Sequence, residues 1–236
     1  MKKVFYIALL AALSGCAGND TSVDSMIRIA QKARSSGNTE AAVNFYNKAL
    51  SMEENNTYAY LGLAEVYIDM NLLDAAEGYI KKAETNGAPI EKTAYLKGKI
   101  FLLRGNDTAA EKEFLKCASS VDALNALGAI YDGRGEHAKA RDLYKQVISR
   151  SPNYIDAYNN MGLSFMIEED YKNAIFYLEN ACALPDANAA YRSNLALAYG
   201  LSGQMNKAKT IYQQDYDGKN LEDKIAYLQE LIAARD

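Results

Sequence analysis

Apolar positions recur along most of this chain in pairs of stripes, one pair in every 34 residues. In each period, positions 4, 7, 8 and 11 share one side of a helix, and positions 20, 24 and 27 share one side of a second helix. Polar residues occupy most other positions. The pattern therefore predicts pairs of amphipathic helices, each pair joined by a short turn.

Six such repeats fit one register. They begin at Val23, Thr57, Glu91, Val121, Ile155 and Ala189. Their spacing is 34 residues except after the third repeat, where it is 30, because Ala118-Ser119-Ser120 closes that repeat without the usual tail. The sequence predicts one continuous array with a single shortened member.

Two positions of the repeat carry only alanine or glycine. Position 8 holds Ala30, Ala64, Gly98, Gly128, Gly162 and Ala196, and position 20 holds Ala42, Ala76, Ala110, Ala140, Ala174 and Ala208. Small residues there let two helices approach until the ridges of one enter the grooves of the other. This pattern and period resemble the tetratricopeptide repeat, whose helix pairs stack into a right-handed superhelical solenoid.

The turns and the C-terminal end support this all-α fold. Position 15 holds Gly37, Asn71, Gly105, Gly135, Glu169 and Gly203, and Gly or Asn favours the left-handed residue that ends a helix, with Glu169 as the exception. Residues 23–218 form the predicted six-repeat domain. Residues 219–236 predict a capping helix that covers the open end of the solenoid with Leu221, Ile225, Leu228 and Ile232.

The N-terminus has the pattern of an export signal. Lys2 and Lys3 precede ten apolar residues, too few to span a bilayer. Leu13-Ser14-Gly15-Cys16 resembles the lipobox of bacterial lipoproteins, which predicts a signal peptide at residues 1–15, lipidation of Cys16 and a tether at residues 16–22. Ala17 after the cysteine implies sorting to the periplasmic face of the outer membrane. The alternative is an ordinary secretory signal with an incidental cysteine.

The net charge of the chain argues against one class of partner. The net charge is −4, and removal of Lys2 and Lys3 with the signal would make it −6, which argues against nucleic-acid binding.

Cys117 and Cys182 fall two repeats apart, too far for a disulfide. We therefore expect two buried free thiols.

Residues for catalysis are scarce. His137 is the only histidine, which excludes most zinc sites, Ser-His-Asp triads and Cys-His dyads. It falls near the start of a second helix, where we expect it to be exposed. No phosphate-binding or dinucleotide-binding loop motif is present. We predict no metal, no cofactor and no enzymatic activity, with an enzyme of unrecognised site as the alternative.

The first helices of stacked repeats line a concave groove, into which positions 2, 5, 9 and 12 point. The candidate binding residues are Ile27, Arg34, Tyr58, Leu61, Glu65, Ile68, Tyr95, Lys99, Leu102, Asn125, Asn159, Leu163 and Met166. Gln31, Lys92, Asp122, Asp132, Asp156, Ser193 and Leu197 occupy further groove positions. Exposed tyrosine and leucine are typical of a peptide-binding or helix-binding site. Alternatively, some of these residues pack between repeats.

The segment from Tyr191 to Gly203, followed by Asn206-Lys207-Ala208, resembles the TadD family of the tight-adherence (Flp/Tad) pilus system. That resemblance implies a lipid-anchored, pilotin-like scaffold that holds a secretin or another pilus-assembly subunit. A general periplasmic adaptor that recruits cell-wall enzymes or other envelope complexes is the alternative. The sequence leaves the client and the oligomeric state open.

Overall fold

The computed structural model describes residues 22–234, and the signal segment, Cys16 and the tether up to residue 21 lie outside the described residues. All regular structure in residues 22–234 is helical, with thirteen helices arranged as six pairs and a final single helix. The first helices of the pairs are α1 (Val23–Ser35), α3 (Thr57–Asp69), α5 (Ile90–Leu103), α7 (Val121–Gly133), α9 (Ile155–Ile167) and α11 (Ala189–Leu201). The second helices are α2 (Thr39–Met52), α4 (Leu73–Thr85), α6 (Asp107–Leu115), α8 (His137–Arg150), α10 (Tyr171–Ala183) and α12 (Met205–Tyr212), and α13 (Gly218–Ala233) follows them.

Local sequence signals explain where the helices begin and end. The side chains of Asn38, Asn56 and Asn106 each accept a hydrogen bond from the backbone N–H three residues later, as N-cap residues do. All six residues at position 15 adopt a positive φ, between 58° and 81°. Glu169, at φ 60°, therefore takes the same left-handed backbone as the glycines, because the turn requires it whatever the residue.

The small residues bring the two helices of each repeat together. The alanines at position 20 are all fully buried. At position 8, a Cβ added to Gly98, Gly128 or Gly162 would overlap the large side chain at position 24 of the same repeat. The predicted solenoid of six tetratricopeptide-type helix pairs with a capping helix is confirmed.

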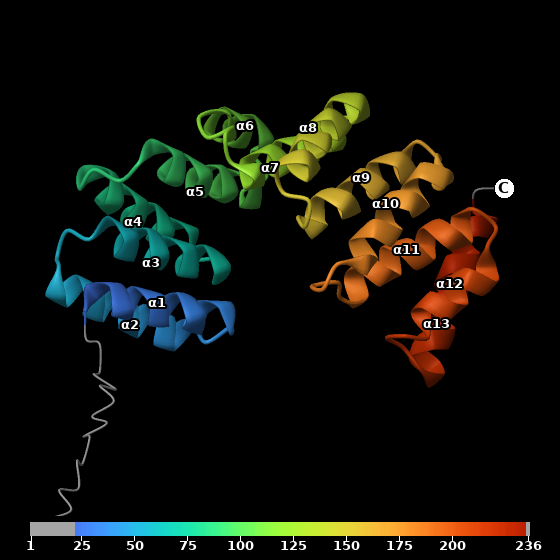
Figure 1. Cartoon of the computed structure of the whole chain (residues 1–236), viewed down its shortest axis with the longest axis horizontal. Helices are drawn as coiled ribbons and strands as arrows, with labels where there is room; N and C mark the ends of the chain where they lie inside the picture. The colour runs from blue at the N-terminus through green and yellow to red at the C-terminus, as the bar shows by residue number, and fades with distance from the viewer. Residues whose placement is uncertain (1–21, 235–236) are drawn as a thin grey trace, which may run out of the picture.

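The helix pairs follow an arch (Figure 1). First helices of neighbouring repeats contact one another, α1 with α3, α3 with α5, α7 with α9, and α9 with α11, so they form the inner, concave side. The contact between α5 and α7 is weaker than these four. The shortened repeat lies at that point, and its second helix, α6, has only nine residues.

The core continues past the shortened repeat, and Cys117 is part of it. Cys117, which is 1% exposed, packs in one cluster with Phe114 of α6 and Leu127 of α7. Cys182 is also a free thiol but is only half-buried, so the expectation of two buried thiols is wrong for this residue. It packs against the outside of the cluster formed by the last repeats.

Helix α13 covers the last repeat. Leu228 is fully buried and lies so close to Gly200 of α11 that any Cβ there would overlap it. Leu221 and Ile232 pack at the margin of the same cluster. Within residues 22–234, no helix has both the length and the hydropathy needed to cross a bilayer.

Candidate protein-binding groove

The predicted groove residues differ widely in exposure. Tyr58 is the most accessible, at 63% exposure. Half-buried positions are Arg34, Glu65, Tyr95, Lys99, Leu102, Asn125, Leu163 and Met166. Buried positions are Ile27, Leu61, Ile68 and Asn159. The buried aliphatic residues belong to the cores between the first repeats and offer little surface to a partner.

A pocket of about 320 Å³ opens in the concave side where the shortened repeat separates α5 from α7. We call it the acidic pocket. Its lining residues are Leu61, Glu65, Glu91, Lys92, Tyr95, Leu96, Ser119, Ser120 and Asp122. Three predicted binding residues, Leu61, Glu65 and Tyr95, are brought together here. The sequence register did not predict that Glu91 and the two serines would join them.

An arginine network joins α1 to α3 beside this pocket. The Arg34 guanidinium donates to Glu65 and, through Nε, to Oδ2 of Asp69 at 2.5 Å. Arg34 and Glu65 were both predicted as groove residues, but here they bind each other. The Arg34 side chain is 27% exposed, so the network lies at the groove surface.

Asparagine side chains connect α7, α9 and α11 further along the concave side. Asn160 donates to Asn125 at 3.1 Å, Asn159 donates to Asn160 at 3.3 Å, and Asn194 donates to Asn159 at 2.7 Å. Sequence reasoning missed Asn160 and Asn194, which occupy position 6. The recurrence of asparagine at one position in two successive repeats was the signal that could have identified them.

Two tyrosine–aspartate hydrogen bonds reinforce the same joints. The Tyr154 hydroxyl donates to Asp122 at 2.7 Å, and the Tyr191 hydroxyl donates to Asp156 at 2.6 Å. Burial, with the nearby Asp156 carboxylate, raises the pKa of Tyr191 to about 12. The hydroxyl therefore remains a donor at neutral pH.

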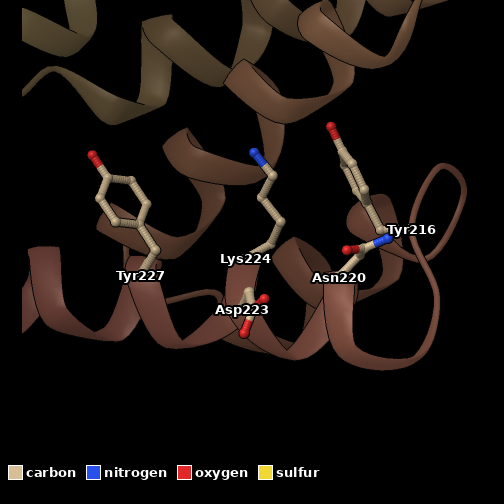
Figure 2. Close-up of a pocket in the computed structure, with 5 residues that line it drawn as sticks. All are labelled: Tyr216, Asn220, Asp223, Lys224 and Tyr227. Atoms are coloured by element: carbon tan, nitrogen blue, oxygen red, sulfur yellow. The ribbon is translucent and has the colours of Figure 1, made fainter.

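A second pocket, of about 470 Å³, lies at the other end of the chain, where α13 begins. We call it the C-terminal pocket. Figure 2 shows Tyr216, Lys224 and Tyr227 rising on one side while Asp223 points away. The Lys224 ammonium lies 5.2 Å from the centre of the Tyr216 ring. The Tyr216 hydroxyl is 3.3 Å from Oγ of Ser193, a groove position, so this pocket adjoins the groove.

His137 is held inside the fold and is not the exposed histidine expected from its position. Its Nδ1 lies 2.9 Å from Oδ1 of Asp132, and its side chain is 16% exposed. Asp132 also accepts hydrogen bonds from Tyr144 at 2.9 Å and from Ser164 at 2.8 Å. This cluster joins α7, α8 and α9. Within the described part of the chain, no three His, Cys, Asp or Glu side chains are grouped to hold a metal ion.

The arch, the stacked helix pairs and the groove define a helical-repeat solenoid. Family models described as tetratricopeptide repeat match residues 33–86, 121–154 and 155–188. The last two matches begin at Val121 and Ile155, as the sequence register does. The protein therefore consists of tetratricopeptide repeats, which in general are non-catalytic scaffolds that bind other proteins.

Two curated proteins are similar over about two thirds of this chain. The BBSome complex member BBS4 homolog of Drosophila melanogaster is 28% identical over 163 residues, which are 69% of this chain and 29% of that protein. The human cilia- and flagella-associated protein 70 is 29% identical over 161 residues, which are 65% of this chain and 14% of that protein. The chain thus spans less than a third of either relative.

Solved structures share the fold at low identity. A chain of the APC/C hetero-tetramer Cut9–Hcn1 aligns with a TM-score of 0.75 and 14% identity over 89% of this chain and 44% of that one. PilF of Pseudomonas aeruginosa aligns with a TM-score of 0.70 and 16% identity over 89% of this chain and 97% of PilF. PilW, described as a type IV pilus biogenesis factor, aligns with a TM-score of 0.70 and 15% identity over 85% of this chain and 97% of PilW. At these identities the likeness establishes the fold alone.

Proposed function

We propose that this protein is an outer-membrane lipoprotein that holds a secretin or another pilus-assembly subunit in its concave groove, in the manner of a pilotin. The observation that carries the proposal is the concave side itself, where half-buried tyrosine, leucine and asparagine side chains come from successive first helices and a pocket opens between α5 and α7. Such a surface suits an extended segment or a helix of a client protein.

Two further observations support the pilus role. Leu13-Ser14-Gly15-Cys16 resembles a lipobox, and the segment from Tyr191 resembles the TadD family. PilF and PilW have the same fold over nearly their whole length. Their likeness makes a pilus role consistent with the architecture, while the N-terminal pattern supplies the proposed location.

The mechanism follows from where the anchor would lie. Seven residues separate Cys16 from Val23, a span of at most about 25 Å when extended. The lipidated cysteine would hold the first repeats beside the periplasmic face of the outer membrane, and the groove would keep the client segment there. The protein contributes binding and position, with no covalent step.

The experiment is a cross-linked pull-down of the lipidated protein from membranes, with partners identified by mass spectrometry. The groove variant is Tyr58→Ala/Tyr95→Ala, and the matched control is Phe176→Ala, which removes an exposed aromatic ring from a second helix. A secretin or pilus-assembly subunit that only the groove variant loses is the expected result. Cell-wall enzymes in its place would favour the general adaptor.

The anchor is tested separately. Cys16→Ser should move the protein from the membrane pellet to the soluble periplasmic fraction, because the variant would lack the acyl chains that hold a lipoprotein stably in the membrane. Retention of this variant in the pellet would reject the lipoprotein assignment while leaving the groove assignment intact.

A further inference from the structure

The acidic pocket exists because the third repeat is short. Its walls come from α3, α5, the connection from α6 to α7 and the first turn of α7. The connection contributes Ser119 and Ser120, and α7 contributes Asp122. Where the other first helices contact each other more fully, α5 and α7 leave room between them. The pocket is therefore specific to this joint of the array and is not a general property of the repeat.

The floor of the pocket is apolar. Leu61 and Leu96 are 7% and 2% exposed, and the half-buried Tyr95 packs against their cluster. Apolar and aromatic walls favour the methylene stem of a long side chain, whose polar end can remain at the rim. Tyr95 lines the pocket, and its ring packs against Phe114 with 5.9 Å between the ring centres.

The rim of the pocket is negatively charged. Glu65, Glu91 and Asp122 line it, and Lys92 is the one basic residue of the lining. Arg34 is shared between Glu65 and Asp69 and so does not reverse the balance. Burial, with the charges of Asp122 and Glu65, raises the pKa of Tyr95 to about 12, which agrees with carboxylates close to the hydroxyl.

Charge decides which ligand fits. A carboxylate or phosphate would meet three carboxylates, and that repulsion disfavours an anionic ligand. A guanidinium or ammonium group would pair with them and could also lie against the Tyr95 ring. The C-terminal pocket differs, since Lys224 lies between two tyrosines there and Asp223 is the one acidic residue of the lining.

We propose that the acidic pocket binds the arginine or lysine side chain of an extended client segment, so that a basic residue anchors the client at the shortened repeat. This inference rests on the proposed function, because it assumes that the groove holds a client segment. It adds that a basic side chain of the client makes the contact and that the contact lies at the shortened repeat.

The test uses the full-length protein in detergent and a random dodecapeptide library as the probe. Selected peptides should carry a central Arg or Lys next to apolar residues. For the best peptide, changing that residue to Gln should weaken binding about tenfold, measured by fluorescence anisotropy at low salt. The Glu91→Gln/Asp122→Asn variant should bind the original peptide about tenfold more weakly and should no longer prefer Arg over Gln.

The matched control is Asp142→Asn/Glu230→Gln, which removes the same two charges from exposed sites outside the groove. Equal weakening by this control, or no preference for a basic residue, would overturn the inference. If selected peptides lack basic residues yet lose binding in Tyr58→Ala/Tyr95→Ala, the groove function survives and only the basic anchor is rejected. If no peptide depends on the groove tyrosines, both are rejected.

Discussion

The two ends of the concave side are joined by different chemistry. Between α1 and α3, the polar contact is made by charged groups, since Arg34 binds Glu65 and Asp69. Between α9 and α11, it depends on uncharged donors, such as the Asn194 amide, which binds Asn159. Salt screens the first kind of contact and leaves the second largely unchanged. Repeats with the same backbone can therefore be coupled by interactions that respond differently to the surroundings.

The largest expected effect on the free energy of unfolding comes from the close packing of helices, which occurs at both ends of the concave side. Gly62→Ala would place a Cβ inside the ring of Tyr46, which is 1% exposed and cannot easily move. We expect a loss of about 1 to 3 kcal/mol in the free energy of unfolding, measured by urea denaturation. Gly78→Ala is the control, because nothing lies within 4 Å of its added Cβ. Equal losses in both variants would mean that the α2–α3 joint is not closely packed.

A smaller loss is expected at the uncharged joint. Asn159→Ala removes the acceptor of the Asn194 amide and the donor to the Asn160 side-chain oxygen, and should cost about 1 kcal/mol. The loss should be the same at low and at high salt. Asn44→Ala, at an exposed helical position, should change stability little. A loss that shrinks with added salt would remove the distinction between the two ends.

The charged joint should give a still smaller and salt-dependent loss. Arg34→Gln should cost about 0.5 kcal/mol at low salt, because partly exposed ion pairs contribute little. The difference from the native protein should approach zero near 1 M salt. Lys32→Gln, an exposed residue of the same helix, is the charge-matched control. An Arg34→Gln effect that persists at high salt would point to packing by the arginine stem.

The smallest expected effect is the pH dependence of stability that comes from Tyr46, which is absent at neutral pH. Burial and the charge of Glu65 raise the pKa of Tyr46 to about 12, against about 10 in an unfolded chain. Because the folded pKa is the higher one, the stabilisation is complete below about pH 10 and is lost as pH rises toward 12. Denaturation at pH 8 to 11.5 should show this decline, and Tyr46→Phe should lessen it. An equal change in Tyr58→Phe would assign the decline to other groups.

The fold could be predicted from sequence because close helix contact restricts residue type. Even the Cβ of an alanine would overlap Tyr144 at Gly128, so the column of small residues marks where the two helices of a repeat touch. The turn also requires a left-handed backbone of a residue that does not favour it. Glu169 adopts φ 60° although it is neither Gly nor Asn.

The site could be predicted only in part, because the repeat period gives the position of a residue on its helix but not the side chains that it contacts on neighbouring helices. The register placed Tyr95 and Glu65 in the groove, and they do line a pocket. It could not show that the shortened repeat would open that pocket. His137 was expected at the surface, but Asp132 reaches it from the preceding helix. Such contacts depend on rotamers and on neighbouring helices.

The capping helix limits how this protein can assemble. A solenoid with an open end presents a surface that fits the start of another copy, and head-to-tail contacts of that kind do not close and can grow into filaments. Here Leu228 occupies the place next to Gly200 that a seventh repeat would need. Within residues 22–234, α13 therefore closes this end of the array after the sixth helix pair.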